Sequence, residues 1–325
     1  MEFDGSKTGL RVLYYGAGWP TNIGNAFIDL GALAILRSAV PNARISFASE
    51  MPRWFFGPGI KNTRTVRFWH KQEHRVMDNA LDIASVTQCD LVVFSGMAAC
   101  GEFLEVNGPT LLSLARRGIP ILLLGVGALA YSDEEKKDYA DFLRQINPIG
   151  FICRDEPTFK MFADIIPGVY PGIDCGFFLP EAYIPLPLEL SAYVVAAFDT
   201  QAEPELSLQG RQLLRAHHDC WGPPREEYTQ TEKTLISDIP YDYLALYAQA
   251  EEIHTDRVHA CVAGLTYGHQ VRLYHPTLRG YLFDSVGCHN IRERLVQADM
   301  NLLAEKKKNQ IAMVERIISD KFGKS

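Results

Sequence analysis

The sequence feature that most constrains the fold is a repeated unit made of a short apolar segment, a turn and a longer segment with helical periodicity. Residues 120–125 (PILLLG) are nearly all apolar, as expected for a central strand of a parallel sheet that is buried on both faces. Comparable segments lie at 10–15, 44–48, 89–95 and 149–153, and helical patterns follow most of them. This alternation predicts an α/β fold with a doubly wound parallel sheet.

A proline-rich segment separates two predicted α/β units. Residues 180–187 (PEAYIPLP) hold three prolines and are predicted to cross between domains 1–180 and 181–325. The second unit is the smaller one, with a strand at 192–198 and a helix that starts near Pro240. Ligands of such folds bind at the carboxyl ends of the strands, so we expect a cleft where the two sheets face each other.

A long helix is predicted at the C-terminal end of the chain. Apolar residues recur at helical spacing over 291–318, which predicts one continuous helix. Lys306–Lys308 interrupt the apolar stripe and are predicted to lie on a solvated turn of that helix.

Composition and charge bound the class of protein. Of the 325 residues, 47% are hydrophobic and 22% are charged, and the formal net charge is -7. These values are typical of a soluble globular protein and give no attraction to nucleic acid or to an anionic membrane. We find no apolar run of the roughly 20 residues that a bilayer requires, and no secretory signal pattern. Seven cysteines scattered through apolar segments indicate a reducing compartment. We expect a cytoplasmic protein, and the sequence predicts no oligomeric state.

The segment 251–274 (EEIHTDRVHACVAGLTYGHQVRLY) is the strongest candidate for chemistry. A helix is predicted to begin near Thr255, with Thr255 or Asp256 as its cap. Arg257 and His259 then lie in the first turn, where the helix dipole and a guanidinium favour an anion and a histidine can move a proton. Because residues two apart do not share a helix face, both reach only a ligand that lies off the helix end. The alternative is an ion-paired Arg257 and a buried structural His259.

The turn after the first strand (GAGWPTNIGN) contains a second group of candidates. The third glycine of a dinucleotide fingerprint is missing, and Pro20 breaks the expected helix start, which argues against NAD or FAD. We interpret the turn as one in which Asn22, Gly24 and Asn25 meet a ligand at the next helix N-terminus. The alternative is a tight turn that Asn25 caps.

Two later strands end in candidate residues. Ser95 and Gly96 follow a buried strand, and small residues there let backbone amides approach a ligand closely. Arg154 ends another strand and is suited to clamp a carboxylate or phosphate with two hydrogen bonds. The alternatives are turn formation alone for Ser95 and Gly96, and an ion pair between Arg154 and Asp155.

Three other clusters of residues are weaker indications of a functional site. Met51–Arg75 interleaves basic and aromatic side chains, which suits either a sugar or anionic acceptor or an ordinary solvated loop. His70 and His74 have the spacing of metal ligands on one helix face, and histidines also cluster at 217–220. Neither group has the further ligands that would complete a metal site, so no metal site is predicted.

Together, these residues resemble the polysaccharide pyruvyl transferase family. The best match is Thr255–Ala260 (TDRVHA), which resembles the family's R-x-H-A block. Asn22–Asn25 resembles an N-x-G-D turn, and the Ser95-Gly96 turn and Phe151–Pro157 (FICRDEP) resemble two further blocks. The pattern spans roughly residues 10–290, which is most of the chain.

The resemblance implies a GT-B-like fold, in which two Rossmann-like domains face each other across a cleft and a C-terminal helix closes the structure. It implies transfer of a pyruvyl group from phosphoenolpyruvate to a sugar or glycan precursor. Phosphoenolpyruvate is then the donor substrate, and we predict no cofactor. Arg257 would then bind the donor's carboxylate or phosphate, His259 would be the general acid, and Arg154 would be a second clamp. The substrate-binding candidates are Asn22, Gly24, Asn25, Ser95 and Gly96.

The sequence also departs from the family's pattern. Asn25 stands where the family usually has aspartate, and Ser95 and Met97 replace part of a glycine run. Two other functions therefore stay open: a GT-B-like glycosyltransferase that uses a nucleotide sugar, and a family member that binds a ligand without catalysis.

Overall fold

The structure, a computed structural model, describes residues 9–17, 22–49, 81–218 and 233–323. The basic and aromatic segment Met51–Arg75, with His70 and His74, lies outside the described residues, so the interpretations of that segment stay predictions.

A six-stranded parallel sheet forms the first half of the chain, in the order β2-β1-β3-β4-β5-β6. Its strands are β1 (Arg11–Gly16), β2 (Arg44–Ser49), β3 (Leu91–Ala99), β4 (Ile121–Ala128), β5 (Gly150–Cys153) and β6 (Val169–Pro171). The helices of this half are α1 (Ile23–Ala39), α5 (Ile83–Val86), α6 (Gly101–Arg116), α7 (Asp133–Ile146), α8 (Glu156–Phe162), η2 (Cys175–Phe178) and α9 (Leu179–Ala182).

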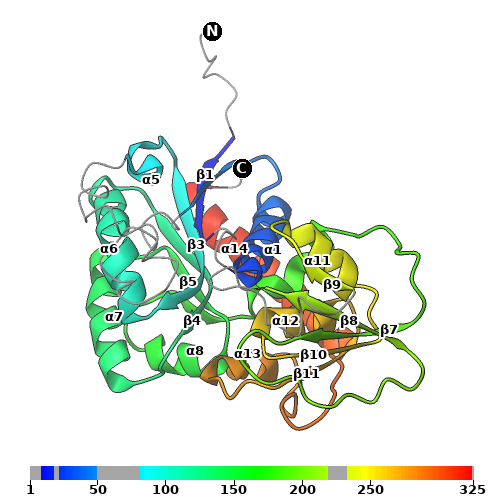
Figure 1. Ribbon diagram of the computed structural model, residues 1–325. Helices are drawn as coiled ribbons and strands as arrows, with labels where there is room; N and C mark the ends of the chain where they lie inside the picture. Colours follow the sequence, from blue (N-terminus) through cyan, green and yellow to red (C-terminus); the bar gives the residue numbers. More distant parts are fainter. Residues whose placement is uncertain (1–8, 18–21, 50–80, 219–232, 324–325) are drawn as a thin grey trace, which may run out of the picture.

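Helices cover both faces of this sheet, which explains its apolar strands. Alternate residues of β1 point to opposite faces, so Val12 and Tyr14 belong to one core cluster and Leu13 and Tyr15 to another. Figure 1 shows α6 and α7 on one side of the sheet and α1 and α14 (Met300–Phe322) on the other.

A five-stranded parallel sheet forms the second half, in the order β11-β10-β7-β8-β9. Its strands are β7 (Tyr193–Ala197), β8 (Gln212–His217), β9 (Thr234–Ile236), β10 (Glu252–Thr255) and β11 (Gln270–Leu273). Its helices are α11 (Pro240–Tyr247), α12 (Val258–Thr266), η3 (Leu278–Gly280) and α13 (Tyr281–Asp284). The two sheets and the C-terminal helix confirm the predicted fold class.

The helix α1 packs between the two sheets (Figure 1). It contacts η2, α9 and α14, and also α11 and α12 of the second half. Val12 of β1 and Val195 of β7 therefore lie in the same core cluster. The helix α14 returns to the first sheet, where the side chain of Gln310 bonds to the backbone N–H and C=O of Ile173 at 2.7 and 3.1 Å. A division of the chain into domains at residue 180 stays a prediction.

The predicted helix at 291–318 is wrong over its first nine residues. The helix α14 starts at Met300, because the Asp299 carboxylate accepts hydrogen bonds from the first free backbone N–H groups. Val296 instead pairs antiparallel with Val271 at the edge of the second sheet. The apolar residues before Met300 thus pack against a sheet edge. Lys307 is buried and its Nζ lies 3.1 Å from the Glu181 carboxylate, so the prediction that it is solvated is also wrong.

The helix predicted over 255–267 begins later than expected. Thr255 is the last residue of β10, and α12 runs from Val258 with Arg257 as its N-cap and no side-chain cap bond. The prediction that Thr255 or Asp256 caps this helix is therefore wrong. No helix in the described part of the chain combines the length and apolar composition needed to cross a membrane.

Candidate functional site

A small pocket lies where the strand order of each sheet reverses. The chain after β1 and the chain after β7 and β10 leave their sheets at these points, and ligands of parallel α/β folds bind there. The pocket has a volume of about 50 Å³. We call it the charged pocket; its lining includes Asn22, Gly24, Arg257, His259, His275 and Arg279.

The turn between β10 and α12 is fixed by two side chains. The Thr255 hydroxyl donates to the Ala197 carbonyl and accepts from the Arg257 backbone N–H. The buried Asp256 carboxylate accepts from the backbone N–H groups of Thr200 at 2.6 Å and of Gln201 at 2.7 Å, and from the Thr200 hydroxyl at 2.7 Å. These bonds tie the loops after β7 and β10 together. Arg257 and His259 thereby lie at the start of α12, two residues apart, and both line the charged pocket.

Asp199 holds the side chain of Arg257. Its Oδ2 lies 3.0 Å from Arg257 Nε, and its Oδ1 lies 2.7 Å from His217 Nδ1. Burial alone would raise the pKa of this carboxyl, but the His217 bond and the Arg257 charge lower it below its ordinary value. Asp199 is therefore an anion that orients Arg257, and its role was not predicted from the sequence.

His259 contacts a second buried carboxylate, that of Asp174. His259 Nε2 lies 3.6 Å from Asp174 Oδ2, and the Asp174 side chain has no exposed area. Burial acts to raise the pKa of Asp174, but His259, the Arg154 charge and the Gly176 backbone N–H outweigh it and the pKa is lowered. Asp174 also caps η2 through a 2.8 Å bond from Gly176 N–H. Asp174 follows β6 in an irregular segment, so no periodic pattern in the sequence marks it.

Arg154 lies behind this pair and does not line the charged pocket. Its side chain is 1% exposed, its Nη1 lies 3.7 Å from Asp174 Oδ2, and its Nε lies 3.5 Å from Asp155 Oδ2. Gly127 provides the space, since a Cβ there would come within 1.9 Å of Arg154 Nε. The pairing of Arg154 with Asp155, which was the alternative from the sequence, is present together with the contact to Asp174.

Arg279 is a cation of the charged pocket that the sequence did not reveal. It lies in η3, where the Thr277 hydroxyl accepts from its backbone N–H and its Nε. Burial and the charges of Arg154 and Arg257 lower the pKa of Arg279 to about 10. Among the described residues, no carboxylate oxygen lies within 4.0 Å of its guanidinium nitrogens. A bound anion would offset the repulsion of Arg279 by the charges of Arg154 and Arg257.

The start of α1 forms the opposite wall. The Asn22 side chain caps the helix by accepting from Gly24 N–H at 2.8 Å, so the cap is Asn22 and the alternative of an Asn25 cap is wrong. A Cβ at Gly24 would lie 3.1 Å from His259 Cβ, so a glycine allows the two helix starts to approach closely. Asn25 is partly buried in the first turn and is not among the lining residues.

Ser95 and Gly96 lie away from the charged pocket. Ser95 is buried and its hydroxyl bonds to the Tyr14 hydroxyl, which in turn donates to the Asp29 carboxylate at 2.7 Å. Gly96 has a φ of +93°, a conformation that favours glycine. Neither Ser95 nor Gly96 is among the described residues that line the charged pocket.

A neutral histidine completes the pocket. His218 is buried, and its Nε2 bonds to the Tyr247 hydroxyl. Burial lowers its pKa to about 3, so the ring is uncharged at neutral pH. The backbone N–H of His218 also faces Asp199, at 3.3 Å from its Oδ2.

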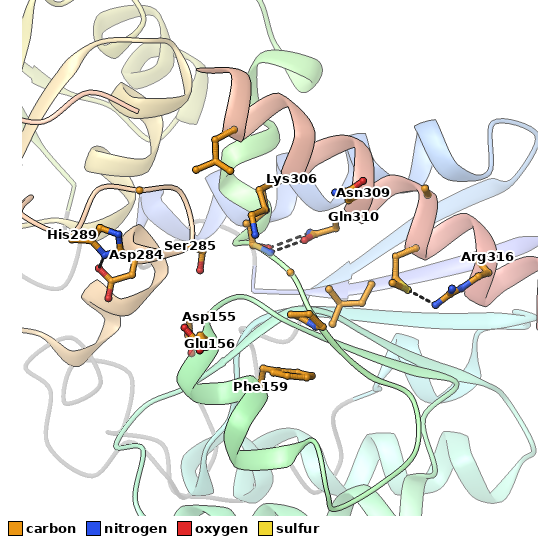
Figure 2. Close-up of a pocket in the computed structure, with 18 residues that line it drawn as sticks. Asp155, Glu156, Phe159, Asp284, Ser285, His289, Lys306, Asn309, Gln310 and Arg316 are labelled. Atoms are coloured by element: carbon orange, nitrogen blue, oxygen red, sulfur yellow. Dashed lines mark hydrogen bonds and ion pairs between the residues drawn. The ribbon is translucent and has the colours of Figure 1, made fainter. Parts of the chain in front are cut away.

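A second, larger cavity lies between α8, α13 and α14 and has a volume of about 950 Å³ (Figure 2). We call it the α14 cavity. Lys306, Asn309 and Arg316 of α14 line one side, and Glu156 and Phe159 of α8 line the other. Its lining differs from that of the charged pocket because its charged side chains are largely exposed.

Comparisons with known proteins place the chain in a family. The sequence profile of the Polysaccharide pyruvyl transferase family matches residues 22–274. This chain therefore belongs to the polysaccharide pyruvyl transferase family, a family of sugar-modifying transferases. A search of curated proteins found no match.

Solved structures support the same fold. A UDP-GlcNAc 2-epimerase from Neisseria meningitidis bound to UDP-GlcNAc is similar with a TM-score of 0.53 at 11% identity, over 97% of this chain and 100% of that chain. A UDP-GlcNAc 2-epimerase from Methanocaldococcus jannaschii is similar with a TM-score of 0.52 at 12% identity, over 93% of each chain. At these identities the likeness shows the fold alone, which is GT-B-like as the sequence resemblance implied.

Proposed function

We propose that this protein transfers a pyruvyl group from phosphoenolpyruvate to two hydroxyls of a sugar or glycan precursor, forming a ketal. The observation that carries this proposal is the pair of arginines, Arg257 and Arg279, that faces His259 in a pocket at the start of α12. Phosphoenolpyruvate carries a carboxylate and a phosphate close to a carbon that must be protonated, and this arrangement matches those needs.

The donor's anionic groups would lie against the start of α12. The backbone N–H groups of the first helical turn lack partners within the helix, and the dipole favours negative charge there. Arg257, held by Asp199, and Arg279 would each bind one anionic group. Because walls from both halves of the chain enclose only about 50 Å³, donor binding would widen the pocket.

The chemistry then balances with His259 as the proton donor. His259 protonates the methylene carbon of the donor, and the C=C electron pair forms the new C–H bond. The central carbon becomes an oxocarbenium-like centre, which the first sugar hydroxyl attacks, and the hydroxyl proton returns to the histidine. Loss of phosphate regenerates the cation, the second hydroxyl adds to it, and its proton leaves with the phosphate. The arginines stabilise the phosphate as it departs.

The test is phosphate release from phosphoenolpyruvate in the presence of a panel of sugars and glycans. We expect release that depends on the acceptor, with carbon from ¹³C-labelled donor found in the product by mass spectrometry. The variant His259→Ala should lower the rate by roughly 10²–10⁴-fold, the range for loss of a general acid. An unchanged rate in this variant would remove the role of His259.

Calorimetry separates the proposal from a nucleotide-sugar transferase. We expect heat of binding with phosphoenolpyruvate that is lost in Arg257→Ala. Binding of UDP-GlcNAc but not of phosphoenolpyruvate would favour the alternative donor. Binding of phosphoenolpyruvate without turnover on any acceptor would favour a non-catalytic family member.

A further inference from the structure

We infer that Asp174 is the positioning residue for His259: it holds the Nε2 side of the imidazole, so that Nδ1 is the nitrogen that faces the charged pocket. This inference rests on the proposed function for its catalytic consequence. The geometric part concerns the free protein and stands apart from the reaction.

Three buried polar atoms that lack hydrogen bonds within the described part of the chain lie near one another behind the charged pocket. Among the described residues, Arg154 Nε, Asp174 Oδ2 and His259 Nε2 are all fully buried and lack a hydrogen bond of good geometry. They lie along a continuous path of charged groups, with 3.7 Å from Arg154 Nη1 to Asp174 Oδ2 and 3.6 Å from there to His259 Nε2. Buried polar groups in folded proteins are almost always paired, so such a cluster indicates a functional requirement.

The two edges of the His259 ring have different surroundings. The Cδ2 atom faces η2, at 3.7 Å from the position that a Cβ on Gly176 would take. The Nδ1 atom faces the start of α1, at 3.4 Å from the equivalent position on Gly24, and Gly24 lines the charged pocket. The Nε2 side is therefore inside the protein, and the Nδ1 side is toward the ligand.

Charge determines which nitrogen keeps its proton. Asp174 is a carboxylate, because the nearby Arg154 and His259 lower its pKa despite its burial. A carboxylate accepts a hydrogen bond, so the neutral ring keeps its proton on Nε2 and leaves Nδ1 as the site that gains and loses one. Arg154 neutralises Asp174 from the other side. We therefore assign Arg154 to this support rather than to direct contact with the donor.

Nitrogen NMR on protein labelled with ¹⁵N in its nine histidines tests the geometry without any substrate. The His259 signals are assigned by their absence in His259→Gln. At a pH where the ring is neutral, we expect its proton on Nε2 in the wild type and a loss of this preference in Asp174→Asn. A neutral His259 protonated on Nδ1 in the wild type would overturn the inference, even if Asp174→Asn failed to fold.

Kinetics test the catalytic consequence. Asparagine keeps an oxygen that can accept from Gly176 N–H, so Asp174→Asn removes the charge but preserves the η2 cap. We expect kcat to fall about 100-fold with KM for phosphoenolpyruvate within about twofold, because positioning acts on proton transfer. Asp284→Asn, which breaks an exposed Asp–His pair with His289, is the matched control and should change neither the His259 spectrum nor kcat.

The outcomes separate the two proposals. Absence of transfer with every acceptor would remove the proposed function, whereas the NMR result would still decide the pairing of Asp174 with His259. Active protein in which Asp174→Asn leaves kcat unchanged would remove the positioning role and leave the proposed function intact.

Discussion

The charged pocket is smaller than the α14 cavity, but among the described residues it contains more buried polar atoms that lack hydrogen bonds. The charged pocket is about 50 Å³ and is surrounded by buried charges. The α14 cavity is about 950 Å³, and the charged side chains that line it are exposed except for Asp155, which is paired with Arg154. In the described part of the chain, His259 and His275 of the charged pocket keep buried nitrogens without hydrogen bonds, and no residue lining the α14 cavity does. Gln310, for example, is satisfied at both ends of its amide by Ile173.

The difference teaches that buried polar atoms without hydrogen bonds, rather than volume, single out the charged pocket as the candidate site. Burying a polar group without a partner costs free energy, so a fold keeps such groups where a ligand or a reaction needs them. Exposed charges are screened and hydrated, and they cost little to keep. Matched substitutions in the charged pocket and in the α14 cavity test this difference.

Removing a cation should have the largest effect in the charged pocket. Arg257→Ala removes the guanidinium that Asp199 orients and leaves that buried carboxylate without one partner. We expect kcat/KM for phosphoenolpyruvate to fall about 1000-fold, or about 4 kcal/mol of transition-state stabilisation. Arg316→Ala in the α14 cavity should change it by less than about twofold. A comparable loss in both variants, in a phosphate-release assay, would break the distinction.

Acid should act through the buried histidine rather than the exposed one. The folded-state pKa of His218 is about 3, below the ordinary value of about 6.5, so below pH 6.5 the unfolded chain takes up a proton that the folded chain does not. The folded state therefore loses up to about 1.4 kcal/mol per pH unit between pH 6.5 and pH 3 from this group.

Urea unfolding across this range measures the effect. His218→Gln should reduce the loss of stability on acidification. His289→Gln should leave the loss unchanged, because the His289 side chain is 68% exposed and is solvated in both states. Equal slopes in wild type and His218→Gln would contradict a neutral, buried His218.

A glycine behind the charged pocket should be harder to replace than one beside the α14 cavity. A Cβ at Gly127 would lie 1.9 Å from Nε of the buried Arg154, so Gly127→Ala must displace that guanidinium, at a cost of about 2–3 kcal/mol. Gly287 has a φ of +79°, and a Cβ there would make only an ordinary van der Waals contact, 3.6 Å from Leu302 Cδ2, so Gly287→Ala should cost only about 1 kcal/mol of backbone strain. Denaturant unfolding measures the free energy of unfolding of the two variants. An equal loss in both would contradict the prediction that Gly127→Ala displaces the Arg154 guanidinium.

The sequence predicted the parts of the structure that follow a regular period. Strands such as β4 were evident because both of their faces are buried, which makes an uninterrupted apolar segment. Arg257 and His259 were chosen as candidates because they stand where a strand gives way to a helix, and both line the charged pocket. Prediction failed where packing replaced periodicity, as before Met300, where apolar spacing serves a sheet edge rather than a helix.

Three important residues of the candidate site had no such signal. Asp174 and Asp199 lie on irregular segments after β6 and β7, and Arg279 lies in the short helix η3. The contacts that bring them to the candidate site are made with residues distant in sequence. An aspartate a few residues after a strand, as in PGIDCG, is the feature that could have drawn attention to Asp174. The contact of Asp174 with His259 itself depends on how η2 packs against α12, which no local pattern encodes.

The smallest of the expected effects concerns the geometry of Arg279 rather than its charge. Arg279→Lys keeps a cation but loses the planar fork that binds a phosphate or carboxylate with two hydrogen bonds. We expect KM for phosphoenolpyruvate to rise about tenfold, or about 1.4 kcal/mol, with kcat less affected. Lys306→Arg, the reverse exchange beside the α14 cavity, should leave KM within about twofold. If Arg279→Lys behaved like Lys306→Arg, the lowered pKa of Arg279 would reflect only its burial and the neighbouring arginines, and not a binding site for an anion.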